Sequence, residues 1–153
     1  MPRDGAGFGK AGRAMQTTIT IDTHSPGLYE FTGEADAFVR SAGRDEGLLT
    51  VFVRHTSCSL LIQENADPDV KRDLDAFFAR LVPPADGPSM GWIVHTLEGP
   101  DDMPAHIKAA LTATSLGIPV SGARMALGTW QGLYLFEHRR RAHRRQIVLY
   151  LSA

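Results

Sequence analysis

Alternating apolar and polar positions predict β-strands over much of the chain. Between Gln16 and Asp22, Ile19 and Ile21 alternate with threonines, a pattern typical of a strand buried on one face. Other segments rich in β-branched and aromatic residues lie between turn signals and are also predicted as strands. They are 28–32, 48–54 with an extended continuation from 57 to 63, 92–96, 124–127, 130–137 and 146–151.

Apolar residues spaced three and four apart predict helices at 35–42, 68–82 and 104–115. Gly43 follows the first helix, where glycine is favoured. Asp67 is the expected N-cap of the second helix, Pro68 its first residue, and Pro104 opens the third. Strands outnumber helices, so we predict an α+β fold: a mostly antiparallel, β-sandwich-like sheet core with two to three helices.

Length and composition are those of one globular domain. The chain has 153 residues, of which 43% are apolar and 22% charged. We predict a flexible leader at 1–14, with Met15 as the functional start, and a single domain at 15–153. The chain has no stretch of the ~20 apolar residues that span a bilayer and no secretion signal, so we expect a cytoplasmic protein without a membrane partner.

The segment around Cys58 combines an apolar and a polar face. In an extended chain, Cys58 shares a face with aliphatic residues, while His55 and Ser57 point to the other side. We therefore expect Cys58 to be a buried core thiol rather than a nucleophile. His55 among hydroxyls suits a general base or a phosphate donor, and a hydrogen-bonded histidine on an edge strand fits the spacing equally well.

Two histidines, His95 and His106, bracket the carboxylates Glu98, Asp101 and Asp102. A strand ending near the first and a helix beginning near the second can bring these groups together. Imidazole with carboxylate suits Zn²⁺, carboxylates alone suit Mg²⁺ carrying a phosphate, and the amides of a helix start favour anions. A helix cap among solvated acids is the alternative interpretation.

The segment 130–137 is apolar on both faces, which predicts a central strand or a strand buried by another subunit. Trp130 and Tyr134 fall on one face, where they can stack on a flat heterocycle, although a core aromatic stripe is the more frequent explanation. The following arginine cluster, Arg139–Arg145, is most simply a solvated hairpin loop. With a net charge of −1 and no aromatic residue in the loop, we do not expect nucleic-acid binding.

Three motifs resemble the YjbQ family of small bacterial and archaeal proteins: HTSCSLLIQENADPDVKRDL, HTLEGPDDMPAHIKAAL and ALGTWQGLYLFEHR. Members of this family are described as secondary thiamine-phosphate synthases. The resemblance runs from about Met15 to the C-terminus. It implies a β-sandwich-like domain that assembles as a homotrimer. It also implies an enzyme that joins a hydroxymethylpyrimidine diphosphate to a thiazole phosphate and releases pyrophosphate.

The family motifs, taken with the chemistry of the residues, suggest a set of site residues. We expect as catalytic residues His55, Ser57, Glu64 and His106. We expect as substrate-binding residues Asn65, Glu98, Asp102, Trp130 and Gln131. We expect as ligands of a divalent metal ion, Mg²⁺ or Zn²⁺, the residues His95, His106 and His138.

The four histidines His55, His95, His106 and His138 are expected to converge on one pocket, within one chain or across a subunit boundary. Asp102 stands where many relatives have Asn, which keeps an oxygen ligand. The expected partner is a small phosphorylated or heterocyclic substrate. A non-catalytic trimeric module that binds metal, phosphate or nucleic acid is the alternative.

Overall fold

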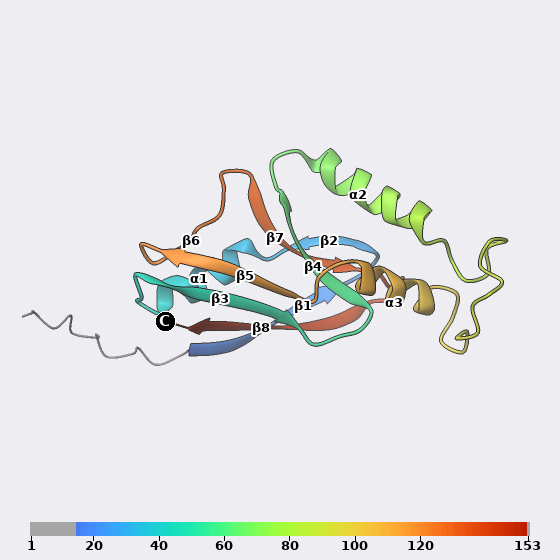
Figure 1. Ribbon diagram of the computed structural model, residues 1–153, viewed down its shortest axis with the longest axis horizontal. Coiled ribbons are helices and arrows are strands. Elements are labelled where there is room, and N and C mark those ends of the chain that lie inside the picture. Colours follow the sequence, from blue (N-terminus) through green and yellow to red (C-terminus); the bar gives the residue numbers. More distant parts are fainter. Residues whose placement is uncertain (1–14, 153) are drawn as a thin grey trace, which may run out of the picture.

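Two antiparallel sheets face each other across one apolar core in the computed structural model, which describes residues 15–152 (Figure 1). The strands are β1 (Met15–Thr23), β2 (Gly27–Glu30), β3 (Glu46–Val53), β4 (Cys58–Glu64), β5 (Ser115–Ser121), β6 (Arg124–Met125), β7 (Gln131–Glu137) and β8 (His143–Ser152). The helices are α1 (Thr32–Ser41), α2 (Pro68–Leu81) and α3 (Asp102–Leu111). The leader predicted at 1–14 lies outside the described residues.

The larger sheet has the strand order β1-β8-β3-β5-β6, and the smaller sheet has the order β2-β7-β4. All pairings between these strands are antiparallel. Aliphatic residues at alternate positions of β3, β5 and β8 face those of β4 and β7, and α1 completes the core with Ala35 and Val39. The predicted α+β class with an antiparallel core is confirmed, and the structure has three helices where two to three were predicted.

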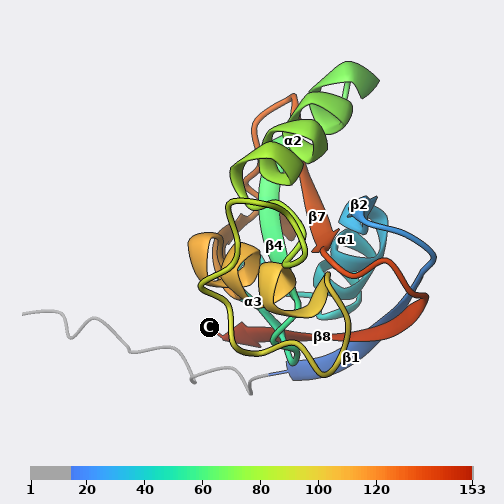
Figure 2. The same ribbon diagram turned by 90° about the vertical axis from the view of Figure 1, so that its right-hand side faces the viewer.

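The strand β7 is covered on both faces by its own chain. Its inner residues Leu133 and Leu135 lie in the core between the sheets. On its outer face, Phe136 meets Phe78 of α2 edge to face, with ring centroids 5.2 Å apart. The predicted central position of β7 is therefore confirmed. Its outer face is covered by α2 of the same chain, so burial of this strand does not require a second subunit (Figure 2).

The helix α2 begins as its sequence predicts, because the Asp67 carboxylate accepts a hydrogen bond of 2.9 Å from the backbone N–H of Asp69. Its apolar stripe is only partly covered. Phe77 and Leu81 are 55% and 52% exposed, and no residue of α2 is fully buried. The helix thus lies on the smaller sheet as an outer layer rather than inside the core.

Several strand and helix boundaries differ from the sequence prediction. The segment 92–96 is not a strand; it belongs to the irregular chain between α2 and α3, where Val94 is 94% exposed and no neighbouring strand offers hydrogen bonds. β2 ends at Glu30, and α3 begins at Asp102 rather than Pro104. Trp130 precedes β7 and is 62% exposed, so it does not join the aromatic face of that strand.

The strand β5 was not predicted, because Gly117 and Pro119 both weaken a strand pattern. Its position in the sheet explains why Pro119 is tolerated. The Pro119 carbonyl accepts a hydrogen bond from the Ala126 backbone N–H, on the side of β6. In a strand, the nitrogen and the carbonyl of one residue face the same side, so the Pro119 nitrogen points away from β3 and no hydrogen bond to β3 is lost. Within residues 15–152, no helix is long and apolar enough to cross a bilayer.

Truncating the core of β7 should be costly. Leu135 is fully buried, so Leu135→Ala should lower the free energy of unfolding by about 2–5 kcal/mol, because it removes apolar contacts and leaves a cavity. The control is Leu97→Ala, at a side chain 99% exposed, which should change stability by less than about 0.5 kcal/mol. Urea denaturation of both variants measures the difference, and equal effects would contradict the described core.

Candidate functional site

Two histidines and one carboxylate form a compact group at one end of the sandwich. His95 comes from the irregular segment before α3, while Asp102 and His106 lie one turn apart on α3. His95 Nε2 lies 2.7 Å from Asp102 Oδ2, and His106 Nε2 lies 3.3 Å from the same oxygen. The structure thus brings together two of the four histidines expected to converge.

The tautomer of His106 follows from its second nitrogen. Nδ1 lies 2.8 Å from the backbone carbonyl oxygen of Thr56, which only accepts hydrogen bonds, so Nδ1 carries a proton. In the neutral ring, Nε2 is therefore an unprotonated acceptor. It faces Asp102 Oδ2, which is also an acceptor.

Asp102 is held as a buried anion, with 2% of its side chain exposed. Burial by itself raises the pKa of this carboxyl. The hydrogen bond with His95 and the nearby Arg139 charge outweigh burial, so the pKa of Asp102 lies below its usual range. The guanidinium of Arg139 contacts Asp102 Oδ1 directly, which leaves Oδ2 to the two imidazoles.

Arg139 also fixes Asp101 and the chain before α3. Its Nε donates to Asp101 Oδ2 at 3.0 Å, and its Nη2 donates to the backbone carbonyl of Glu98 at 3.1 Å. Burial raises the pKa of Asp101, but the hydrogen bonds from the Arg140 backbone and the Arg139 side chain lower it further than burial raises it. The start of α3 is thus tied to the segment that follows β7.

A second polar cluster lies buried between the sheets behind this site. The Glu137 carboxylate pairs with Arg145 through two contacts, of 2.5 and 2.7 Å, and accepts a 2.7 Å hydrogen bond from the Thr23 hydroxyl. It also accepts from the backbone N–H groups of His138 and Arg139. Burial raises the pKa of Glu137, but these hydrogen bonds, led by that of Arg145, bring it below its usual range.

The arginine cluster is not the solvated hairpin loop predicted from sequence. β7 and β8 belong to different sheets, so residues 138–142 cross from one to the other. Arg139 and Arg145 are only 8% and 3% exposed. Arg139 forms an ion pair with the buried Asp102, and Arg145 forms one with the buried Glu137. Arg144 pairs with Asp22 on the surface. Three of the five arginines are therefore engaged within the chain, which argues against a nucleic-acid patch.

His55 and Ser57 precede β4 and lie near the buried ion pair. Ser57 Oγ accepts from Arg145 at 3.0 Å, and His55 Nε2 accepts from the backbone N–H of Gln146 at 2.9 Å. Both side chains therefore have structural partners. Cys58 is fully buried in the core as predicted, and burial raises the pKa of its thiol to about 12.

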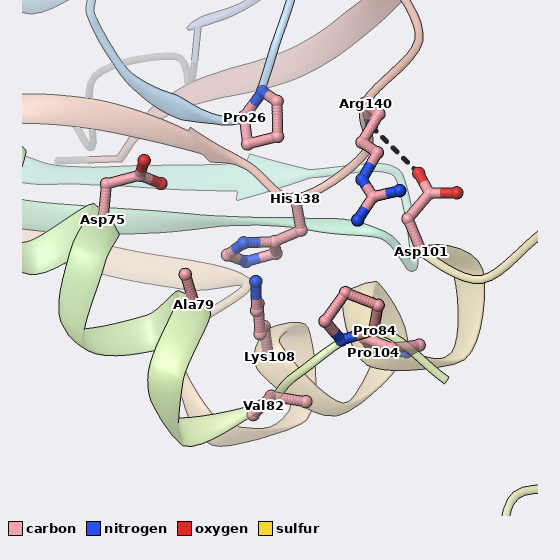
Figure 3. Close-up of a pocket in the computed structure, with 10 residues that line it drawn as sticks. All are labelled: Pro26, Asp75, Ala79, Val82, Pro84, Asp101, Pro104, Lys108, His138 and Arg140. Atoms are coloured by element: carbon pink, nitrogen blue, oxygen red, sulfur yellow. Dashed lines mark hydrogen bonds between the residues drawn. The ribbon is translucent and has the colours of Figure 1, made fainter. Parts of the chain in front are cut away.

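His138 lies apart from the other histidines, on the outer face of the smaller sheet. Its ring is 3% exposed, packs against Phe136 with centroids 4.4 Å apart, and places Nε2 2.9 Å from Ser59 Oγ. It lines a cavity between α2 and α3 (Figure 3). Burial, reinforced by the Lys108 ammonium, lowers the pKa of His138 to about 3.

Four expected site residues lie at the opposite end of the smaller sheet. In the ladder between β4 and β7, Glu64 pairs with Gln131 at one end and Cys58 with Glu137 at the other. With ~3.4 Å per residue, these ends are about 20 Å apart. The set is Glu64, Asn65, Trp130 and Gln131. Their contacts stay at this end of the sheet: Asn65 Nδ2 donates to Glu30 Oε1 at 3.2 Å, and the Gly128 N–H donates to Gln131 Oε1 at 2.8 Å.

The compact group fits a divalent metal ion. His95, Asp102 and His106 each offer one ligand atom, and these atoms all lie within 4.8 Å of one another. Tetrahedral zinc holds neighbouring ligand atoms about 3.3 Å apart. The separation of His106 Nε2 and Asp102 Oδ2 already has this value, while the 2.7 Å contact between His95 and Asp102 has to widen. Two further hydrogen bonds orient the ligands: the Thr56 carbonyl accepts from His106 Nδ1, and the Arg139 guanidinium donates to Asp102 Oδ1.

Sequence reasoning missed Arg139, Arg145 and Glu137 as residues that organise the site. A signal was present for two of them. The alternation of apolar residues at 147, 149 and 151 in β8 continues back to Arg145, and Glu137 shares its side of β7 with Leu133 and Leu135. A charged residue on the inner side of each strand is the pattern of a buried ion pair.

The low pKa of His138 makes stability depend on pH. Unfolded histidine binds a proton near pH 6.5 and folded His138 only near pH 3, so the unfolded state binds more protons between these values. Stability should fall as the pH drops from 7 to 5, by up to about 1.4 kcal/mol per unit. His55, whose pKa burial lowers, adds to this slope, and the carboxylates act mainly below pH 5.

Urea denaturation at pH 7, 6 and 5 measures this slope. His138→Gln should flatten it, whereas His24→Gln, at an exposed position, should leave it unchanged. An unaltered slope in folded His138→Gln would contradict the buried neutral imidazole.

The chain is similar to proteins of one known family. Residues 17–153 match the family described as UPF0047 protein YjbQ-like. A UPF0047 protein of Synechocystis is 51% identical over 140 residues, which cover 92% of each chain. The UPF0047 protein YjbQ of Escherichia coli is 41% identical over 90% of this chain and 96% of its own.

Solved structures agree with the fold. A crystal structure from Aeropyrum pernix matches with a TM-score of 0.80 and 29% identity, and covers 91% of this chain and 99% of its own. One from Thermus thermophilus matches with a TM-score of 0.74 and 33% identity, over 86% of this chain and 97% of its own. The chain belongs to the UPF0047 family of YjbQ-like proteins.

Proposed function

We propose that this protein is a metal-assisted transferase that acts on small phosphorylated heterocycles. The specific reaction we propose joins a hydroxymethylpyrimidine diphosphate to a thiazole phosphate and releases pyrophosphate. The proposed ligands of the divalent metal ion are His95, Asp102 and His106. We also propose that the protein acts in the cytoplasm.

One observation carries this proposal: two acceptors face each other at the centre of the site. His106 Nε2, unprotonated in the neutral ring, lies 3.3 Å from Asp102 Oδ2. Two lone pairs at this distance repel unless a proton or a metal ion lies between them. His95 approaches the same oxygen, so the group is built to share one positive centre among three ligands.

Space for a phosphorylated substrate lies beside this group. An open cavity of about 620 Å³ is lined by residues that include Glu98, Arg139, Arg141 and His143. Arg141 and His143 are basic side chains suited to a diphosphate, while Arg139 is already engaged with Asp102. The cavity thus offers cationic groups, and Arg139 connects it to Asp102, one of the proposed metal ligands.

The reaction breaks the bond between the pyrimidine methylene carbon and the diphosphate oxygen, and forms a bond from that carbon to the thiazole nitrogen. A bound divalent ion would neutralise charge on the departing diphosphate. Arg141 binds the same leaving group, and Arg139 holds Asp102 in its anionic form. The chain's own contribution is to orient the diphosphate and to keep the ligand set charged.

The expected residues Glu64, Asn65, Trp130 and Gln131 enter this proposal through a homotrimer. They lie too far from His95 to act on the same substrate within one chain. Trp130 is 62% exposed, so its indole is available to a neighbouring subunit or to a substrate ring held between subunits. In a trimer, the metal ligands of one subunit and the Trp130 end of the neighbouring subunit would together form one complete site.

A metal-binding experiment tests the proposed ligands. Protein purified without a histidine tag should hold about one Zn²⁺ or a related divalent ion per chain, measured by elemental analysis. His106→Ala and His95→Ala should each lose most of it and lower kcat about 10²-fold or more, because each removes a ligand. The control is His24→Ala, an exposed histidine outside the site.

Two results would contradict the proposal. One is wild-type turnover in both folded site variants. The other is full activity after the metal has been removed with EDTA. Steeply salt-dependent binding of nucleic acid without turnover would instead support the non-catalytic module.

Light scattering tests the assembly. We expect a trimer mass that holds on tenfold dilution. A monomer mass at all concentrations would contradict the shared site, while leaving the metal group of one chain intact. Trp130→Ala should raise KM for the substrate in the trimer without changing bound metal, because it lies at the far end of the sheet from the metal ligands.

A further inference from the structure

The cavity between α2 and α3 is separate from the site described above. It has a volume of about 180 Å³ and is lined by residues from α2, from α3 and from the segment after β7 (Figure 3). Lys108, which lines it, follows His106 by two residues, and at 100° per residue it leaves α3 on the opposite side from His106. The cavity and the metal group therefore lie on opposite sides of one helix.

A buried nitrogen without a partner marks this cavity. His138 Nδ1 is buried and makes no hydrogen bond within the described part of the chain. Ser59 is fully buried too, and His138 Nε2 is the one partner of its hydroxyl there. Since the hydroxyl proton needs an acceptor, Ser59 donates to Nε2, and Nδ1 carries the ring proton. A buried N–H donor without a partner is thus left on the ring that lines the cavity.

Two cationic side chains reach the same space. Figure 3 shows the Lys108 ammonium beside the His138 ring and the Arg140 guanidinium directed into the cavity from the loop after β7. Among residues 15–152, neither side chain forms an ion pair with a carboxylate within 4.0 Å. Three donors, two of them charged, therefore lie at one cavity.

Two carboxylates also line the cavity and must be counted. Asp101 already has two donors, since its Oδ2 accepts from Arg139 Nε and from the Arg140 backbone N–H. Asp75 faces the cavity from α2 and attracts Lys108. Arg139 is shared between Asp101 and Asp102, so it offsets only part of the Asp101 charge. The Lys108 and Arg140 charges therefore face one carboxylate without a hydrogen-bonded cation, that of Asp75, and one that is partly offset.

We propose that this cavity binds a single phosphate group, through the Lys108 ammonium, the Arg140 guanidinium and the N–H of His138. Small-molecule sites usually measure ~300–1,000 Å³, so a cavity of about 180 Å³ admits a phosphoryl group or free phosphate but not a whole nucleotide. Phosphate supplies several acceptor oxygens for these three donors. This site is independent of the metal proposed at His95, Asp102 and His106.

Titration with inorganic phosphate at constant ionic strength tests the proposal. Calorimetry should detect phosphate binding at the same affinity in the wild type and in Arg141→Gln, because Arg141 lines the other cavity, and in His106→Ala, because the metal group is not involved. Lys108→Gln should weaken binding about tenfold or more, since it removes a charge and keeps a polar side chain. Lys71→Gln is the matched control, because Lys71 lies on α2 over the Tyr134 ring, outside the cavity.

A second readout does not depend on any substitution. The ¹⁵N and ¹H signals of the His138 Nδ1–H group should shift on addition of phosphate and stay in place with chloride. Acetate at the same concentration distinguishes a general carboxylate site from a phosphate site, and equal affinity for acetate would overturn the assignment to phosphate. Equal phosphate affinity in Lys108→Gln and the wild type, or an unmoved His138 signal at saturating phosphate, would overturn the site.

Discussion

The buried ion pair between Glu137 and Arg145 is the interaction on which the functional end of this molecule depends. It joins the last residue of β7 to the inner side of β8, and so ties the two sheets together where they open. Each charge is almost fully buried, and removal of one partner would leave the other uncompensated, at a cost of about 3–5 kcal/mol. Thr23 and two backbone N–H groups complete the carboxylate's hydrogen bonds.

The same carboxylate sets the course of the chain that follows it. Because Glu137 accepts from the N–H groups of His138 and Arg139, these two residues leave the strand in fixed and different directions. Arg139 reaches Asp101 and Asp102 at the start of α3, and His138 reaches the cavity on the outer face of the smaller sheet. One buried anion therefore positions groups on two sides of α3.

Much of the fold could be predicted from sequence, because local patterns determine it. The cap at Asp67, the alternation in β1 and the doubly apolar β7 all act through neighbouring residues. The site was predictable only in part. His95 and Asp102 are seven residues apart, and their contact needs little more than a turn of chain. The role of Arg139 depends on a crossing between sheets, which periodicity does not reveal.

The expected convergence of four histidines also shows the limit of motif reasoning. His95 and His106 meet because one carboxylate serves both, whereas His138 occupies the outer face of a strand whose inner face holds Glu137. Side chains of adjacent strand residues point to opposite faces, so a motif that places Glu137 before His138 must divide its functions between two surfaces. The polar residues of a short motif at a strand therefore belong to one site only if they point to the same face. Here Glu137 and His138 point to opposite faces, so the motif contributes to two separate sites.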